Sequence, residues 1–235
     1  PMTEPVTHLT LEAPAGLIEV SAQCRSGKAE SITLTNVPAF AQHRGATLQV
    51  EGYGDVKVDT AFGGDSFVMV DAADFGLKIT PRNAHVIAEL GRKLVKAANE
   101  QLPFHHPTLP EWKHYSFCFM REPLERVDDV LTSRNACVVN PGKLDRSPTG
   151  TGCSALMAVL HAKGLMQVGD TYIGRSVIDS KFIGRIAGEA TVGNHKAIIP
   201  QITGRAWISG QTTLMLDPDD PYPDGYKVSD TWPNG

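Results

Sequence analysis

The chain has 235 residues, of which 41% are hydrophobic and 20% are charged. This composition is typical of a folded globular protein and excludes collagen, coiled coils and intrinsic disorder. The net charge of −4 argues against a nucleic-acid partner, and the absence of any run approaching ~18 apolar residues argues against a membrane partner.

Residues 1–80 predict short strands separated by turns. Apolar and polar residues alternate there with a period of two, and Pro, Gly and Asn stand between the alternating runs. The expected strands are His8–Leu11, Leu17–Ala22, Ser31–Asn36, Thr47–Val50, Val56–Ala61 and Phe67–Asp71. Together they indicate an antiparallel sheet.

A helix is predicted after these strands. Thr80-Pro81 and Asn83 are suitable helix starters, and Pro103 ends the helix. The apolar residues that recur on one face at about 3.6-residue spacing are Val86, Ile87, Leu90, Leu94, Val95 and Ala98.

The second half predicts two more strands, a second helix and a further set of strands. His114–Met120 and Ala136–Val139 are the two strands, and the buried helix includes Ala155–Leu160 and stops at Gly164. Strands resume from Thr171 through Leu216, and the tail from Asp217 to Gly235 is expected to wrap the surface. This order predicts an α+β protein in which each sheet wraps its own helix.

The most unusual segment is Asp145-Arg146-Ser147-Pro148-Thr149-Gly150-Thr151-Gly152. Its glycines come directly before the second helix, so backbone N–H groups without intrahelical partners point at whatever occupies the loop. The helix dipole adds partial positive charge at the same place. The segment therefore predicts an anion site.

Four interpretations of this loop compete. It can be a tight turn that caps a core helix. Gly150-x-Gly152-x-x-Ala155 also fits a dinucleotide-binding fingerprint. In that fingerprint a strand runs directly into the glycines, whereas here nine residues separate Asn140, after the predicted strand, from Gly150. A Walker phosphate loop is excluded because no Gly-Lys-Ser/Thr follows the glycines. The fourth interpretation is a bound amino acid, whose carboxylate contacts the loop amides and whose amine contacts Asp145.

The run from Asp145 to Gly152 resembles the second active-site motif of the proline racemase family at eight consecutive positions. That family includes proline racemases, hydroxyproline epimerases and trans-3-hydroxy-L-proline dehydratases. The other similar segments are Glu12–Ile18, Phe62–Phe67, His106-Pro107, Asp217–Pro221 and Gly225-Tyr226. The resemblance thus covers nearly the whole chain.

The resemblance implies the α+β fold of the diaminopimelate epimerase superfamily. In that fold two similar domains each wrap a mostly antiparallel sheet around a central helix, and the site lies in the cleft between them. The expected division is an incomplete first domain at 1–80 and a second domain at 81–215. A tail at 216–235 can return to the first domain.

Thr149 decides which chemistry we expect. Racemases and epimerases of the family work with two cysteines on opposite faces of the substrate α-carbon, and the second cysteine stands where this chain has Thr149. A thiol with a pKa near ~8.5 supplies thiolate and thiol near neutrality, whereas an unassisted alcohol exchanges protons less readily. The resemblance therefore favours dehydration of trans-3-hydroxy-L-proline to pyrroline-2-carboxylate. The alternatives are 4-hydroxyproline 2-epimerase and proline racemase.

The resemblance also implies the roles of single residues. Thr149 is the expected catalytic residue, Asp145 holds the ring amine, and the amides of Gly150 and Thr151 hold the carboxylate. His114 lies in a segment similar to the hydroxyproline epimerase branch, in which a histidine contacts substrate, although a surface position is the alternative. We expect structural positions for His105, His161, His195, Phe67 and Cys153.

The family's first motif, a Cys or Ser followed by Gly-His, is not found in the 235 residues. Its expected place is just before the segment that begins this chain, which opens with Pro1 rather than Met, so we expect N-terminal truncation. Cys24 has neither Gly nor His after it and does not replace the motif. An inactive fragment or an amino-acid-binding protein is therefore a further alternative.

The expected chemistry needs no cofactor, because amide and amine contacts can stabilise a carbanion-like intermediate. The expected partner is a small-molecule substrate, hydroxyproline or proline, and the resemblance implies a homodimer. The four cysteines are far apart and contain no CxxC pair, which predicts buried reduced thiols, no metal site and a cytoplasmic location.

Overall fold

The computed structural model describes residues 2–226. Contacts between residues divide the chain into two units, Pro1–Arg205 and Ala206–Gly235. The helices and strands of the described residues all lie in the first unit. The boundaries expected near residues 80 and 215 stay predictions.

The strands of the first unit, in chain order, are β1 (Val6–Ala13), β2 (Gly16–Arg25), β3 (Lys28–Thr35), β4 (Ala39–Val50), β5 (Gly54–Phe62), β6 (Ser66–Asp71), β7 (Phe117–Arg121), β8 (Glu125–Val127), β9 (Val130–Val139), β10 (Lys143–Leu144), β11 (Thr171–Arg175), β12 (Lys181–Val192) and β13 (His195–Gly204). The α-helices are α1 (Ala84–Gln101) and α2 (Gly150–Ala162), and the short 3-10 helices are η1 (Ala72–Phe75) and η2 (Pro81–Asn83). The protein is therefore α+β and rich in sheet, as the sequence predicts.

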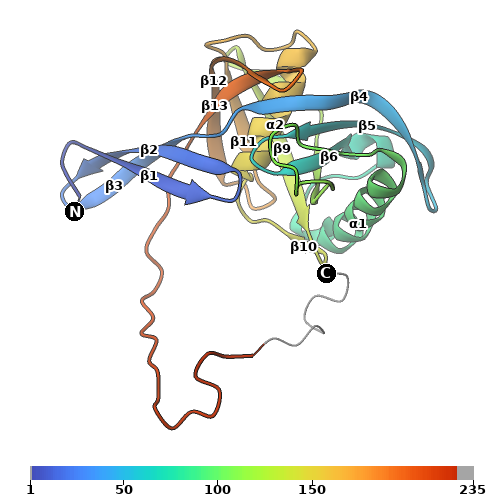
Figure 1. The fold of residues 1–235 in the computed structure, drawn as a ribbon. Helices are drawn as coiled ribbons and strands as arrows, with labels where there is room; N and C mark the ends of the chain where they lie inside the picture. Colours follow the sequence, from blue (N-terminus) through green and yellow to red (C-terminus); the bar gives the residue numbers. More distant parts are fainter. Residues whose placement is uncertain (1, 227–235) are drawn as a thin grey trace. The chain divides into compact units, whose positions relative to one another are not determined.

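The strands form a sheet that closes on itself (Figure 1). Its order runs β1-β2-β3-β13-β12-β11-β9-β7-β6-β5-β4. β13 also pairs with β4, where Ala197 lies opposite Phe40, so the path from β4 to β13 forms a ring. β6–β7 and β9–β11 are parallel pairs, and the remaining pairs are antiparallel.

Helix α2 lies inside this ring. It contacts β4, β5, β6, β12 and β13, and every residue from Gly152 to Leu160 is buried. A helix that is apolar on all sides has to be surrounded by other elements. The prediction of a sheet wrapped around a helix is confirmed for this part of the chain.

Helix α1 packs against the opposite face of β4 and β6 and also contacts β7 and β9. Along β6, Phe67 and Met69 pack toward α2, whereas Val68 and Val70 pack toward α1. This follows from the two-residue period of a strand. Val86, which was expected on the apolar face of α1, is 43% exposed, because the buried face is narrower than the pattern suggested.

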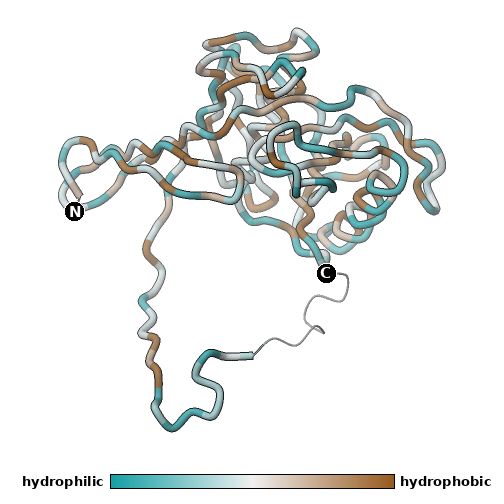
Figure 2. Tube along the Cα trace, in the orientation of Figure 1, coloured by the Kyte–Doolittle hydropathy of each residue, from teal (hydrophilic) through white to brown (hydrophobic). Residues whose placement is uncertain are grey.

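Other predicted elements differ from the structure at their ends. The early strands are confirmed, but β7 begins at Phe117 rather than at His114, and β9 begins at Val130 rather than at Ala136. The prediction of strand through Leu216 is wrong beyond Gly204, where β13 ends. In the second unit, Figure 2 shows apolar and polar residues intermixed along an irregular segment. The predicted tail falls partly on residues 227–235, which lie outside the described residues.

Within residues 2–226, no helix is both long enough and apolar enough to cross a membrane. In the same residues no cluster of three or more His, Cys, Asp or Glu side chains has the arrangement of a metal site.

Three histidines lie at the end of the ring formed by β4 and β13, where His106 is buried and His43 and His195 are partly exposed. The ring of His195 stacks on Phe40 with centroids 4.7 Å apart, and the ring of His106 packs edge-on against Phe62 at 4.4 Å. Burial lowers the pKa of His43, His106 and His195 below the ordinary value of 6.5, and the charge of His195 lowers the pKa of the other two further. His195 packs on Phe40 but also lines a cavity, so its structural role stays a prediction.

These histidines predict loss of stability in mild acid. As the pH falls below the ordinary histidine pKa of 6.5, these histidines are protonated in the unfolded chain before they are protonated in the folded chain. The free energy of unfolding therefore falls as the pH is lowered. Calorimetry between about pH 7 and about pH 5 should show a smaller drop in Tm for His195→Gln than for the wild type. His8→Gln, at an exposed position on β1, is the control, and equal slopes for all three proteins would contradict the prediction.

Candidate active site

Three separate segments meet at one edge of the ring. The parallel strands β6 and β7 both begin there, at Ser66 and Phe117, and β9, which is antiparallel to β7, ends there at Val139. The segment before β6, the segment before β7 and the loop after β9 therefore lie together. Helix α2 begins at the end of that loop, at Gly150.

Asp145 organises the loop that leads into α2. Its Oδ1 accepts a hydrogen bond from the Ser147 amide at 2.9 Å, and its Oδ2 accepts one from the Ser147 hydroxyl at 2.9 Å. The Thr149 hydroxyl also donates to Asp145 Oδ2, at 2.6 Å. The sequence predicts Asp145 as the ligand of an amine, and the structure adds that this carboxylate fixes the direction of the Thr149 hydroxyl.

Thr149 has a strained backbone. Its φ is 62° and its ψ is 96°, a region that β-branched residues rarely adopt and that costs on the order of 1–3 kcal/mol. The side chain is 9% exposed, and the Thr149 amide donates to the Ser147 hydroxyl at 3.1 Å. Strain of this kind gathers at functional sites, which supports the choice of Thr149 as a candidate catalytic residue.

The N-terminus of α2 offers amide donors beside Thr149. The first helical bond runs from the Cys153 amide to the Thr149 carbonyl at 2.8 Å. The amides of Gly150, Thr151 and Gly152 precede it and have no partner inside the helix. The structure thus brings four predicted residues, Asp145, Thr149, Gly150 and Thr151, into one anion-binding geometry.

Hydrogen bonds of Asn36 and Ser154, which no sequence pattern predicts, hold this end of α2 in place. Asn36 Nδ2 donates to the Gly63 carbonyl at 2.7 Å and to Ser154 Oγ at 3.2 Å. Ser154 Oγ in turn donates to the Gly150 carbonyl at 2.9 Å. A contact between residues 36 and 154 depends on strand pairing across the chain, and no local pattern in the sequence indicates it.

Two buried thiols lie against the loop. Burial raises the pKa of Cys137 well above the ordinary value, the Thr149 side chain acts against this shift, and the negative charges of Asp145 and Asp65 add to it. The Cys153 thiol donates to the Pro148 carbonyl at 3.2 Å, and burial also raises its pKa. Both groups therefore remain neutral thiols. Cys153 lies behind the loop, where the sequence analysis expects it.

His114 lies at the same edge of the ring but is not joined to the loop. Its carbonyl accepts a hydrogen bond from Ser66 Oγ at 2.7 Å, and its side chain is exposed. Among the described residues no hydrogen bond connects this imidazole to Asp145 or Thr149. The structure therefore fixes the backbone of His114 and leaves its ring accessible.

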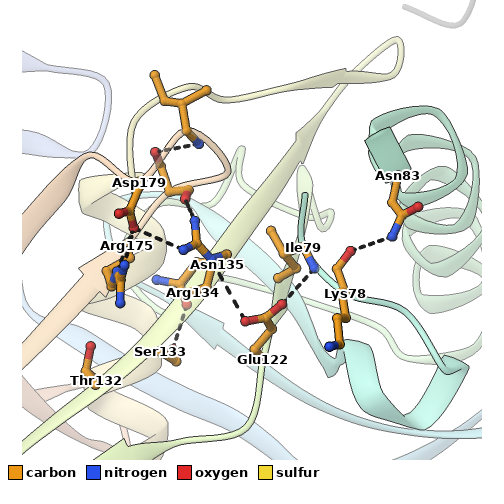
Figure 3. Close-up of polar contacts among 12 residues, drawn as sticks. Lys78, Ile79, Asn83, Glu122, Thr132, Ser133, Arg134, Asn135, Arg175 and Asp179 are labelled. Atoms are coloured by element: carbon orange, nitrogen blue, oxygen red, sulfur yellow. Dashed lines mark hydrogen bonds and ion pairs between the residues drawn. The ribbon is translucent and has the colours of Figure 1, made fainter. Parts of the chain in front are cut away.

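Figure 3 shows an ion-pair network around Arg134 and Asp179. Asp179 Oδ1 lies 2.6 Å from Arg175 Nε and 3.1 Å from Arg134 Nη2. These contacts hold the turn between β11 and β12, where the Ser180 hydroxyl donates to the Arg146 carbonyl at 3.2 Å. The network thus reaches the residue that follows Asp145.

A cavity of about 860 Å³ lies at the other end of α2 and includes Gln42, Arg44, His161 and Glu189 in its lining. A helix C-terminus carries partial negative charge, which disfavours a carboxylate ligand. His161 Nε2 lies 3.3 Å from Glu189 Oε1, so this histidine has a surface partner there. We therefore assign the candidate site to the N-terminal end of α2.

Solved structures of two relatives match the chain closely. A probable proline racemase from Agrobacterium radiobacter K84, with bound carbonate, is 37% identical with a TM-score of 0.87 over 99% of this chain and 67% of its own. A hydroxyproline epimerase from Agrobacterium vitis, with bound trans-4-hydroxy-L-proline, is 38% identical with a TM-score of 0.87 over 99% of this chain and 66% of its own. The chain therefore spans about two thirds of the length of these relatives.

A more distant likeness and a family model complete the comparison. A methylitaconate-delta-isomerase is 13% identical, with a TM-score of 0.51 over 88% of this chain and 66% of its own, and at that identity it indicates a shared fold alone. The family model described as proline racemase matches residues 1–227. With this match and the two close relatives, the chain belongs to the proline racemase family.

Proposed function

We propose that the protein binds a proline-type amino acid at the N-terminus of α2 and dehydrates trans-3-hydroxy-L-proline. The observation that carries the proposal is the Thr149 hydroxyl, whose proton is directed at Asp145 Oδ2 over 2.6 Å. An alcohol is a far weaker acid than a thiol, so it is poorly suited to exchange a proton with the substrate α-carbon near neutral pH. Racemisation needs such exchange on both faces of that carbon, whereas dehydration needs one base.

The binding geometry suits both charges of the amino acid. The amides of Gly150 and Thr151 face the carboxylate at the positive end of the helix dipole. Asp145 accepts three hydrogen bonds from its own loop, and a carboxylate has about four acceptor positions, so one remains for the ring ammonium. Thr149 then lies between the two groups and beside the α-carbon.

The proposed reaction is an elimination. A base removes the α-proton, and the electron pair of the C–H bond forms a double bond between the α-carbon and C3. The C3–O bond breaks, and the hydroxyl leaves as water after taking up a proton. The enamine product tautomerises to the cyclic imine, pyrroline-2-carboxylate. The loop amides stabilise the negative charge that develops on the carboxylate in the first step.

Epimerisation of 4-hydroxyproline is the second candidate. It is supported by the solved hydroxyproline epimerase, which is 38% identical and holds trans-4-hydroxy-L-proline. The two reactions differ in what happens to the ring hydroxyl, because an epimerase keeps it and a dehydratase removes it.

Proton NMR in heavy water tests the proposal. Trans-3-hydroxy-L-proline and trans-4-hydroxy-L-proline are offered separately to the 235-residue chain and to the product of its full open reading frame. We expect the full product to convert the 3-hydroxy compound to the cyclic imine and to leave the 4-hydroxy compound unexchanged. Deuterium at the α-carbon with the hydroxyl retained would favour the epimerase. Binding of both compounds without turnover would assign the protein to amino-acid binding.

A further inference from the structure

The two glycines before β6 bring their neighbour Asp65 to the N-terminus of α2. A Cβ atom on Gly63 would lie 2.9 Å from the Ala155 Cβ atom, and one on Gly64 would lie 3.1 Å from Thr151 Cγ2. Gly64 also has a φ of +97°, which favours glycine. The turn is therefore pressed against the first residues of α2, and Asp65 follows immediately.

The Asp65 carboxyl lies in the same group of side chains as the loop. Its Oδ1 accepts a hydrogen bond from the Ser66 amide at 2.7 Å, and the Ser116 side chain lowers the pKa of its carboxyl. The negative charges of Asp65 and Asp145 both raise the pKa of the buried Cys137 thiol, so both carboxyl groups act on this edge of the ring.

Asp65 has capacity for another donor. The residue is half-buried, and burial raises the pKa of its carboxyl, although hydrogen bonds from Ser116 and Ser66 and the charge of His114 act against that shift. A partly desolvated carboxyl gains more from a ligand hydrogen bond than one in bulk water does. Its two protein partners leave about two acceptor positions open. The exposed imidazole of His114 acts electrostatically on this carboxyl, and the His114 carbonyl accepts a hydrogen bond from the hydroxyl of the next residue, Ser66.

We propose that Asp65, with His114 beside it, receives the ring hydroxyl of a hydroxyproline and so determines the preference for hydroxylated over unhydroxylated substrates. This inference rests on the proposed function, because it takes the carboxylate and amine of the ligand to be held by Gly150, Thr151 and Asp145. The carboxylate and the amine of the ligand then lie at the loop, and its ring carbons extend toward the segments before β6 and β7. A hydroxyl on the ring donates to the Asp65 carboxylate, whereas proline leaves that carboxylate without the bond.

Binding measurements on the product of the full reading frame test the inference. Isothermal titration with trans-3-hydroxy-L-proline, trans-4-hydroxy-L-proline and L-proline gives the preference for a ring hydroxyl. A hydrogen bond to a charged group corresponds to about a 10- to 100-fold change in affinity. We expect Asp65→Asn to weaken the binding of the preferred hydroxyproline by about this factor, while the affinity for proline changes less than about 2-fold.

Two further variants separate recognition from folding. Asp74→Asn, on the exposed helix η1, is the matched control and should keep the wild-type preference. Asp65→Glu keeps the charge but moves the carboxyl by one methylene, so the preference should fall while the melting temperature stays close to that of Asp65→Asn.

The outcomes distinguish the inference from the function on which it rests. If the wild type binds none of the three compounds, the proposed function fails and the inference fails with it. If the wild type prefers a hydroxyproline and Asp65→Asn keeps that preference, only the inference is overturned. Equal weakening of all three ligands, or failure of both Asp65 variants to fold, would assign Asp65 to the turn rather than to the ring hydroxyl.

Discussion

Replacing Thr149 by cysteine is expected to introduce exchange of the substrate α-hydrogen. The thiol would stand at the N-terminus of α2, where the helix dipole favours the thiolate, although the neighbouring Asp145 opposes it. A general acid or base placed at the reacting atom contributes roughly 10²- to 10⁴-fold in rate. We therefore expect deuterium incorporation at the α-carbon of proline or 4-hydroxyproline to rise by at least about 100-fold.

The measurement is proton NMR in heavy water on the product of the full reading frame. Thr149→Ser keeps a hydroxyl and should behave like the wild type, and Thr149→Val removes the hydrogen bond to Asp145 while keeping the shape of the side chain. Exchange in Thr149→Val as fast as in Thr149→Cys would show that the thiol is not the exchanging group. An inert Thr149→Cys in a protein that still dehydrates its substrate would contradict the role given to this position.

Replacing Gly63 by alanine is expected to destabilise the protein and to disturb the site. The added methyl group would overlap backbone atoms of Thr151 and Ala155 in the first two turns of α2, and backbone cannot move aside as a flexible side chain can. Overpacking of this kind costs about 1–3 kcal/mol of unfolding free energy. For a chain of this size that corresponds to a fall in Tm of roughly 2–4 °C for each kcal/mol.

The control for Gly63→Ala is Gly188→Ala. A Cβ atom on Gly188 would lie 3.7 Å from Ile199 Cδ1, which is an ordinary contact. Calorimetry should show a clear fall in Tm for Gly63→Ala and little change in Tm for Gly188→Ala. If the two variants melt alike, the close approach between Gly63 and α2 is not what positions the helix.

The part of the site that the sequence predicts is the part that is contiguous. Asp145, Thr149, Gly150 and Thr151 lie in one short run, and their spacing before an apolar helix is enough to suggest an anion site. Their hydrogen bonds to one another span at most a few residues, as the Asp145–Thr149 contact does. Local chemistry of this kind can be read without knowledge of the fold.

The remaining parts of the site depend on strand pairing. Asn36 reaches Ser154 because it lies between β3 and β4, and β4 packs against α2. Cys137 comes near the loop because β9 ends there. The early part of β9 is also hidden in the sequence, because Ser133, Arg134 and Asn135 are polar. These residues are strand residues because β7 and β11 pair with β9 on its two sides.

The errors have the same origin. Alternating residues beyond Gly204 suggested further strand, but alternation forms a strand only where a neighbouring strand supplies hydrogen bonds. Val86 matched the helical spacing of α1, but the sheet contacts only a narrower part of that helix. In both cases the sequence pattern indicates a local tendency to form a strand or a buried face, and the packing of neighbouring elements determines whether it forms.

The closed ring also sets the order of events when the chain is synthesised. Phe40 of β4 emerges from the ribosome early, but its partner Ala197 on β13 emerges after nearly all of the ring has been made. Until then α2, whose residues from Gly152 to Leu160 are all buried in the finished protein, has no complete enclosure. Synthesis at about 5–20 residues per second leaves this apolar helix uncovered for seconds, which is the situation in which nascent chains aggregate or recruit chaperones. Completion of the β12–β13 hairpin is therefore required before α2 can be fully enclosed.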